Sequence, residues 1–165
     1  MTEEEQLKWG SHQPALMACV AATIGPVLEV GIGHFSTPLL SAYCRNADRK
    51  LISLEKNDVW FCAFAQAEGK NHRVIKVDDY AASVASYMQH EWSVCFIDNE
   101  GGGQARACLF ALALPKCQFV VVHDYHRENE EAIGPLLSGV SHFVTNTYEP
   151  PTLVASMKRD VTKMF

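Results

Sequence analysis

The chain has 165 residues, of which 48% are hydrophobic and 20% charged, and its net charge is −5 at pH 7. This length and composition indicate one globular domain, residues 1–165, with a substantial core and a helical segment over 1–24. The acidic balance and the lack of a lysine and arginine cluster argue against nucleic-acid binding through phosphates, and no apolar run reaches the ~18 residues of a transmembrane helix.

The six cysteines lie singly, mostly in apolar segments, and no Cys-x-x-Cys pair occurs. This spacing disfavours a zinc site and indicates reduced core cysteines in a cytoplasmic protein. The acidic start, Thr2 to Glu5, supports the same location, because a secretory signal begins with basic residues. Neither a membrane nor a nucleic acid is therefore expected as a partner.

Helices and strands are predicted to alternate along the chain. A capping-box pattern at Thr2 and Glu5 predicts a short helix through Trp9, and a second helix is expected over about 13–23. Short aliphatic runs predict five strands, at 27–30, 51–54, 73–77, 93–97 and 118–122. The segments after these strands predict helices at about 38–47, 57–69, 82–90, 104–114 and 128–137.

Two further β segments, 141–147 and 152–157, end the pattern. The few residues between them are too short for a helical crossover, so the two segments are expected to pair as an antiparallel hairpin. Apolar strands separated by helices of about ten residues indicate a parallel sheet covered on both faces. The predicted fold class is therefore α/β: a doubly wound, mostly parallel seven-stranded sheet with a C-terminal antiparallel hairpin.

The stretch Glu29-Val30-Gly31-Ile32-Gly33 ends the first strand and leads into a helix, for which Ser36 or Thr37 is the expected cap. A strand, a glycine turn and a helix N-terminus together form a cradle for a nucleotide-type ligand. The dinucleotide fingerprint requires a third glycine where this chain has Ser36. The Glu29 carboxylate also repels a phosphate, whereas it attracts a ligand with an ammonium and a sulfonium group.

An acidic residue before Gly-x-Gly, five βα units and a closing hairpin resemble the class I S-adenosylmethionine-dependent methyltransferases over about residues 25–158. The layout is nearest to the small-molecule O-methyltransferases. The resemblance implies S-adenosylmethionine as cofactor. In this resemblance Glu29 binds the methionyl amino group, and Gly31 and Gly33 allow the backbone to approach the cofactor closely. Glu55 binds the ribose hydroxyls, and Asp78 or Asp79 binds the adenine amino group. Asp98 lies beside the methyl group.

Other interpretations of these residues stay open. Any one of the acids can simply terminate an apolar strand. Glu55 also suits the ribose of a dinucleotide. Tyr80 or Trp60 is a candidate for packing on the adenine ring, with core packing the alternative for Trp60. The glycine run 101–103 is either a substrate-entry loop or a flexible connector.

His123 and Asp124 follow the fifth strand and are the candidate catalytic residues. Metal-dependent O-methyltransferases place an Asp after strand four and Asp-Asn after strand five, so the resemblance makes Asp98, His123 and Asp124 a candidate set for a divalent metal. An imidazole in the set shifts the preference from Mg²⁺ towards Mn²⁺, Fe²⁺ or Zn²⁺. The alternative role of His123 or His126 is general base. The remaining histidines carry no partner pattern and are expected to be structural or exposed: His12, His34, His72, His90 and His142.

The sequence therefore predicts an enzyme that transfers a methyl group from S-adenosylmethionine to an oxygen or nitrogen of a small molecule. The alternative is a non-catalytic adenosyl-binding or scaffold protein of the same fold. A third interpretation, a nicotinamide-dependent oxidoreductase, is disfavoured by Ser36 and by the lack of a Tyr-x-x-x-Lys pair. The acceptor pocket is expected to be shallow, or to be completed by the N-terminal helices or by a second subunit of a homo-oligomer.

Overall fold

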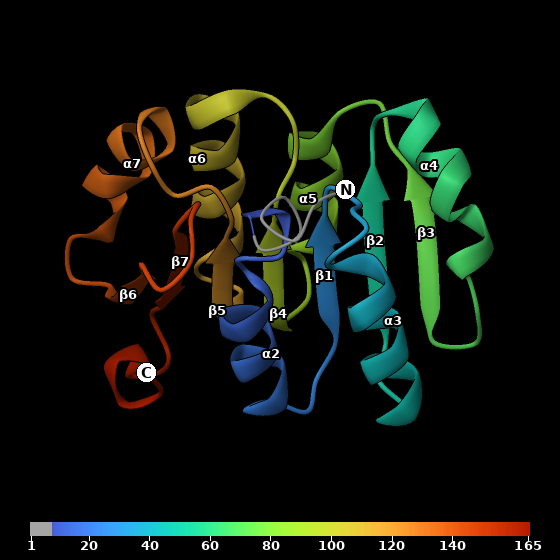
Figure 1. Cartoon of the computed structure of the whole chain (residues 1–165), viewed down its shortest axis with the longest axis horizontal. Helices are drawn as coiled ribbons and strands as arrows, with labels where there is room; N and C mark the ends of the chain where they lie inside the picture. Colours follow the sequence, from blue (N-terminus) through green and yellow to red (C-terminus); the bar gives the residue numbers. More distant parts are fainter. Residues whose placement is uncertain (1–7) are drawn as a thin grey trace.

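A computed structural model describes residues 8–165 of the chain (Figure 1). The short helix predicted from Thr2 falls mostly on residues 1–7, outside this part. The sheet has seven strands: β1 (Val27–Val30), β2 (Leu51–Glu55), β3 (His72–Lys76), β4 (Trp92–Ile97), β5 (Cys117–Val122), β6 (Ser141–Thr145) and β7 (Thr152–Ser156). Their spatial order is β3-β2-β1-β4-β5-β7-β6. Strands β1 to β5 are parallel, and β7 runs antiparallel to both of its neighbours. The predicted fold class is confirmed.

Six α-helices and three short 3₁₀ turns lie wholly within the described residues; α2 precedes β1, η3 follows β7, and the others connect strands. The helices are α2 (Gln13–Ala21), α3 (Thr37–Asn46), α4 (Asp58–Phe64), α5 (Tyr80–Tyr87), α6 (Gly102–Ala113) and α7 (Glu128–Ile133). The 3₁₀ turns are η1 (Ala65–Ala67), η2 (Gly134–Leu137) and η3 (Val161–Lys163). No helix in the described part of the chain is long and apolar enough to cross a membrane.

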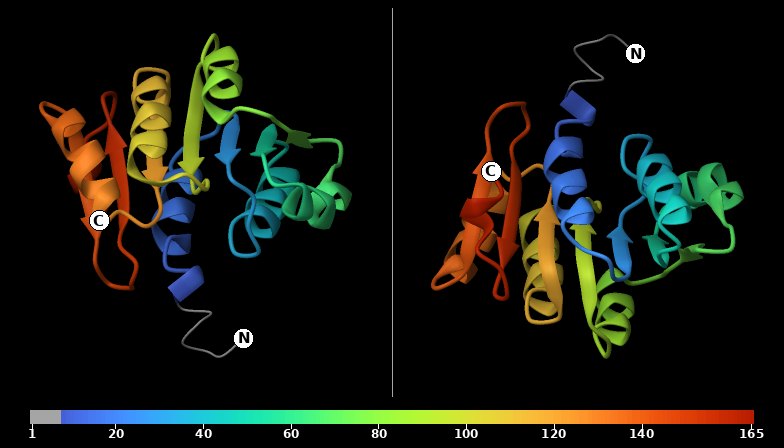
Figure 2. Two further views of the ribbon diagram at one scale, coloured as in Figure 1. Left: turned by 90° about the horizontal axis from the view of Figure 1, so that it is seen from above. Right: turned by 90° about the horizontal axis from the view of Figure 1, so that it is seen from below.

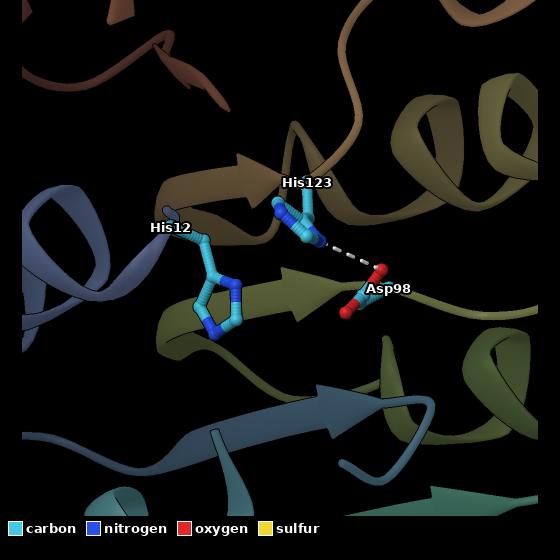
Figure 3. A group of neighbouring side chains, drawn as sticks. All are labelled: His12, Asp98 and His123. Atoms are coloured by element: carbon cyan, nitrogen blue, oxygen red, sulfur yellow. Dashed lines mark ion pairs between the residues drawn. The ribbon is translucent and has the colours of Figure 1, made fainter. Parts of the chain in front are cut away.

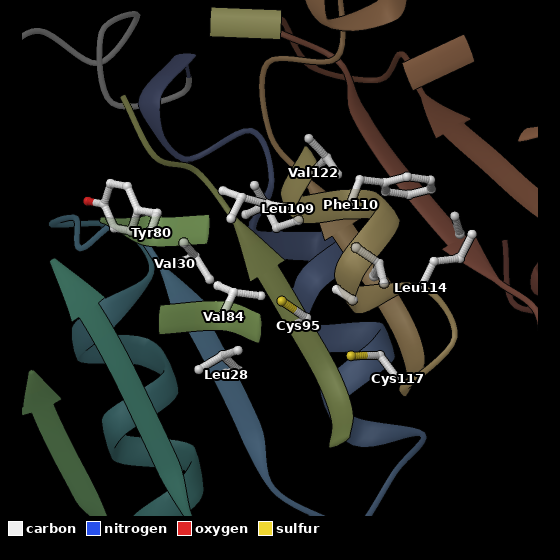
Figure 4. Packing of buried hydrophobic residues seen from close by; sticks show 14 of the residues in the cluster. Leu28, Val30, Tyr80, Val84, Cys95, Leu109, Phe110, Leu114, Cys117 and Val122 are labelled. Atoms are coloured by element: carbon white, nitrogen blue, oxygen red, sulfur yellow. The ribbon is translucent and has the colours of Figure 1, made fainter. Parts of the chain in front are cut away.

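Helices lie on both faces of the sheet (Figure 2), and an apolar layer lies between the sheet and the helices on each face. Helices α5, α6 and α7 pack on one face, where Leu28 and Cys95 meet Val84 and Leu109 (Figure 4). Helices α2 and α3 pack on the other, with α2 against β4 and β5. Because strand side chains alternate between the faces, Leu28 and Val30 of β1 belong to the first layer while Val27 belongs to the second.

Two predicted helices are shorter than the pattern indicated. The segment predicted as one helix over 128–137 divides into α7 and η2, and Pro135 lies in the first turn of η2. Proline has no N–H for an α-helical hydrogen bond and its ring clashes with the preceding turn, so α7 ends just before it. The helix predicted over 57–69 likewise ends as α4 at Phe64 and continues as η1.

Candidate active site

The loop after β1 passes so close to the end of β4 that only glycine fits at position 31. Gly31 has a φ of +92°, and a Cβ on it would lie 2.4 Å from the carbonyl oxygen of Asp98. A side chain there would meet both a steric clash and the left-handed backbone conformation. The glycine turn is therefore required by the approach of two strand ends, before any ligand is considered.

Glu29 lies beneath this loop and is fully buried. Thr37 donates from Oγ1 to Glu29 Oε1 (3.0 Å), Ser53 donates to Oε2, and the N–H of Gly33 donates to Thr37 Oγ1 (3.0 Å). Burial raises the pKa of Glu29 to about 7, opposed by hydrogen bonds from Ser36, Ser53 and Thr37. Glu29 does not line the cleft described below; it contacts the second glycine of the loop through Thr37.

Glu55 connects the ends of β1 and β2. Its Oε2 accepts from the backbone N–H of Ile32 (2.8 Å), and its Oε1 accepts from the N–H of Asn57 (2.6 Å) and the hydroxyl of Tyr80 (3.0 Å). Asn57 in turn caps α4 by accepting from the N–H of Val59 (2.9 Å). The Glu55 side chain is only 4% exposed, yet it forms part of the cleft wall.

A cleft of about 440 Å³ opens at the carboxyl ends of β1, β2 and β4, within the usual size range of small-molecule sites. Ligands of open α/β sheets bind at this edge. Its wall includes the loop residues 31–36, Glu55, Trp60 and Tyr80 on one side, and His12, Asp98, Arg106 and Asp124 on the other.

Arg106 of α6 organises the second side of the cleft. This buried guanidinium donates to the carbonyl oxygens of Asn99 (3.0 Å) and His123 (2.6 Å). Its Nη2 also lies 3.3 Å from Asp98 Oδ1 and 3.7 Å from Asp124 Oδ2. The sequence offered one signal for this role, because Arg106 is the only charged residue in helix α6.

His12, Asp98 and His123 converge from the N-cap of α2 and the ends of β4 and β5 (Figure 3). One ligand atom of each lies within 4.8 Å of those of the others. Asp98 Oδ1 is 3.2 Å from His123 Nδ1, and the two imidazole rings meet edge to face, with centroids 4.5 Å apart. Burial lowers the pKa of His12 to about 4; the neighbouring His123 lowers it further, while Asp98 and the Phe35 carbonyl oppose the shift.

No protein-family model and no curated protein sequence matches the chain, whereas its fold is similar to that of solved structures. A candidate caffeoyl-CoA O-methyltransferase from Staphylococcus aureus has a TM-score of 0.64 and 13% identity, over 87% of this chain and 81% of that one. An rRNA methylase from Streptococcus thermophilus has a TM-score of 0.57 and 11% identity, over 88% and 94%. The methyltransferase MycE of the mycinamycin biosynthetic pathway, in complex with Mg and SAH, has a TM-score of 0.59 and 12% identity, over 96% of this chain and 49% of its own.

The chain has the class I S-adenosylmethionine-dependent methyltransferase fold. The resemblance inferred from the order and spacing of its elements is thereby confirmed at the level of the fold. Among the similar structures, one is named for caffeoyl-CoA and another for rRNA. The methyltransferase fold therefore does not decide what kind of acceptor a given chain uses.

Several residues predicted for the methyltransferase site lie apart from the cleft wall. Asp78 and Asp79 are both exposed, and Asp79 accepts from the N–H of Ala82 (2.8 Å), so its carboxylate caps α5. His126 is half-buried beside Asp124 and lines a neighbouring hollow. Within the glycine run, Gly103 is closely packed, since a Cβ on it would lie 2.2 Å from the carbonyl oxygen of Glu128, whereas Gly101 is exposed.

The cleft wall also contains residues that the sequence did not assign to the site, among them His12 and His34. His12 is 2% exposed, and Ser36 is the N-cap residue of α3 although its hydroxyl makes no capping hydrogen bond. His34 lies against Trp60, with ring centroids 5.2 Å apart. Asp124 is 3.8 Å from His123 Nε2 and stands outside the His12, Asp98 and His123 cluster.

Gly31→Ala is expected to lower the free energy of unfolding by roughly 1–3 kcal/mol, because the new Cβ meets the Asp98 backbone and φ is positive. Urea denaturation measures the change. Gly69→Ala is the matched control, because a Cβ at position 69 would have nothing within 4 Å of it and the φ of Gly69 is not in the left-handed region. Equal effects of the two substitutions would contradict the close approach.

Because of Glu29, the free energy of unfolding is expected to fall as the pH rises. A carboxyl whose pKa is higher in the folded chain binds more protons when folded, so its contribution is complete below the unfolded value of 4.5 and is lost as the pH rises to about 7. Relative to Glu29→Gln, the wild type should lose on the order of 1–3 kcal/mol of unfolding free energy between these values. Burial lowers the pKa of His72, so this residue makes the free energy of unfolding rise with pH. It does so in the wild type and in Glu29→Gln alike.

Urea denaturation of both proteins at a series of pH values provides this comparison. Glu131→Gln, a substitution at an exposed position of α7, serves as the control and should run parallel to the wild type. Parallel curves for the wild type and Glu29→Gln would show that Glu29 does not titrate in this range.

Proposed function

We propose that the chain is a methyltransferase that moves a methyl group from S-adenosylmethionine to an oxygen or nitrogen of a small molecule. The observation that carries the proposal is Glu55, a buried carboxylate that lines the cleft at the end of β2, next to the Gly31 loop. A carboxylate has roughly four acceptor positions. The donors from Ile32, Asn57 and Tyr80 occupy three of them, so one acceptor position on Oε2 stays open. That position suits a ribose hydroxyl.

The rest of the cofactor follows from the cleft wall on the Glu55 side. Gly31 and Gly33 leave room for the methionyl part to approach the backbone, and Glu29 supports Gly33 from beneath through Thr37. Asp78 is the better candidate of the aspartate pair for the adenine amino group, because the carboxylate of its neighbour already caps α5. Trp60 and Tyr80 supply ring surface beside the adenine. Asp98 lies on the side where the methyl group is expected.

Methyl transfer from a sulfonium is an in-line displacement. The acceptor lone pair bonds to the methyl carbon while the carbon–sulfur bond breaks, sulfur keeps the electron pair, and the acceptor loses its proton. Positioning supplies much of the acceleration in such a reaction. We assign the acceptor side to Asp124, which lines the cleft and is in position to receive the proton, and to His123, which lies behind it.

A small-molecule acceptor is favoured by the charge of the cleft. Arg106 is the only lysine or arginine in the cleft wall, within the described chain, and Asp98 and Asp124 flank it. An RNA acceptor needs several cationic contacts to phosphates. Trp9, which is 60% exposed at the edge of the cleft, offers apolar surface to a ring or an acyl group.

Calorimetric titration and a transfer assay test this function together. We expect S-adenosylmethionine and S-adenosylhomocysteine to bind and NAD not to bind, and tritium from labelled S-adenosylmethionine to enter a pool of small hydroxyl- and amine-bearing molecules. Label in an RNA fraction instead would overturn the small-molecule acceptor. Binding without transfer to any acceptor would favour the non-catalytic adenosyl-binding protein, and NAD binding would favour an oxidoreductase.

Glu55→Ala is expected to weaken S-adenosylhomocysteine binding about tenfold to a hundredfold, because a charge-assisted hydrogen bond is worth roughly 1.5–3 kcal/mol. The dissociation constant from calorimetry measures the effect. Tyr80→Phe is the matched control: it removes one donor to Glu55 but keeps the carboxylate, so the affinity should change little. Thermal unfolding of both variants separates lost binding from lost folding. Unchanged affinity in a folded Glu55→Ala protein would exclude Glu55 from the site.

A further inference from the structure

Ser11 determines which nitrogen of His123 carries a proton. Its Oγ lies 2.8 Å from the carbonyl oxygen of Pro150 and 3.0 Å from His123 Nε2. A carbonyl only accepts, so the single hydroxyl hydrogen of Ser11 points to Pro150. The hydroxyl oxygen must then accept from His123, and the hydrogen of this interaction resides on Nε2. In the neutral imidazole, Nδ1 consequently presents a lone pair.

That lone pair faces a second acceptor. His123 Nδ1 lies 3.2 Å from Asp98 Oδ1, and it has no hydrogen-bond partner among the described residues. Two acceptors at this distance repel unless a cation lies between them. Ligand atoms that each lie about 2.1 Å from one metal ion are about 3.0 Å apart at an octahedral angle and about 3.4 Å apart at a tetrahedral angle, so the observed 3.2 Å fits two ligands of a single ion.

His12 supplies an independent indication. His12 is only 2% exposed, and neither of its ring nitrogens makes a hydrogen bond of accepted geometry within the described chain, although the Phe35 carbonyl lies nearby. A buried imidazole without hydrogen-bond partners is destabilising, so native structures normally provide a partner for it. A ligand atom of His12 lies within 4.8 Å of those of Asp98 and His123. Figure 3 shows its ring beside the space between the other two side chains.

We propose that His12, Asp98 and His123 bind one divalent transition-metal ion. Two imidazoles and one carboxylate suit Zn²⁺, Fe²⁺, Co²⁺ or Mn²⁺. MycE, which has the same fold, is described in complex with Mg. Mg²⁺ prefers all-oxygen surroundings, so it does not fit this set. The proposed ligands also differ from the set expected from the sequence, because His12 takes the place of Asp124.

The surroundings of the cluster favour a bound cation. The hydrogen bond from His123 Nε2 to Ser11 holds the ring in the orientation and tautomer that a ligand needs. Asp98 and Asp124 together outweigh the single positive charge of Arg106 between them, so a net negative charge remains. Three protein ligands leave coordination positions open, and His12 and Asp98 both line the cleft.

A bound ion would supply Lewis-acid chemistry, since an acceptor hydroxyl at an open coordination position would become more acidic. This use of the ion depends on the proposed function. Binding of the ion does not depend on it.

Cobalt titration of the chelator-treated protein tests the site without any turnover. We expect one equivalent of Co²⁺ to bind with visible d–d absorption, Zn²⁺ to displace it, and Mg²⁺ in large excess to leave the spectrum unchanged. His12→Ala should weaken Co²⁺ binding at least tenfold and alter the spectrum. His90→Ala, which removes an exposed histidine, is the matched control and should bind as the wild type does.

Circular dichroism verifies that each variant folds, and His12→Gln, which keeps most of the side-chain volume, replaces His12→Ala if the alanine variant unfolds. Absence of Co²⁺ binding by the wild type would overturn the site. Equal binding by wild type and a folded His12 variant would also overturn it. Titration of the same samples with S-adenosylhomocysteine separates the two proposals, because cobalt binding without adenosyl binding refutes only the proposed function.

Discussion

The contact between the β1 loop and the end of β4 at Gly31 is the constraint on which the cleft depends. Because position 31 has no Cβ, the loop can turn against the Asp98 and Asn99 backbone and bring the N–H of Ile32 to Glu55. The Glu55 carboxylate then joins β1, β2 and the start of α4 at one point. A buried carboxylate is stable only when donors surround it, so these backbone groups position Glu55 and are positioned by it.

The sequence was sufficient for the fold because the relevant signals are local. Aliphatic runs, the glycine turn and the length of each connection determine which segments form strands and whether neighbours run parallel, and these features need no tertiary information. The same reasoning brought Glu55 and Asp98 to one edge of the sheet. It does not decide the role of Asp79, because its place after β3 is compatible with a ligand contact and with a helix cap; in the structure its Oδ1 accepts from the N–H of Ala82 and so caps α5.

The alternation of strand side chains could have taken the sequence reasoning further. Phe96 and Val121 belong to the layer covered by α2 and α3, so two residues on, Asp98 and His123 emerge on that same face. Helix α2 packs on β4 and β5, which places its N-cap residue His12 beside them. What the sequence alone does not contain is that α2 lies across these two strands. His12 is more than 80 residues away from Asp98 and His123 in the chain, so the sequence did not indicate that it lies beside them.

The two sides of the cleft consequently differ in how they are built. The Glu55 side consists of loops that follow β1 and β2, each positioned by its own neighbours in sequence. The opposite side is composite: the Ser11 hydroxyl joins the β5 end to the carbonyl of Pro150 in the β6–β7 connection, and Arg106 bridges from α6. Long-range hydrogen bonds of this kind hold His123 and Asp98 face to face at a fixed distance, an arrangement of two acceptors that a cation stabilises. If the ion binds as proposed, it also links His12 at the start of α2 to the ends of β4 and β5. His12 then becomes part of the acceptor side.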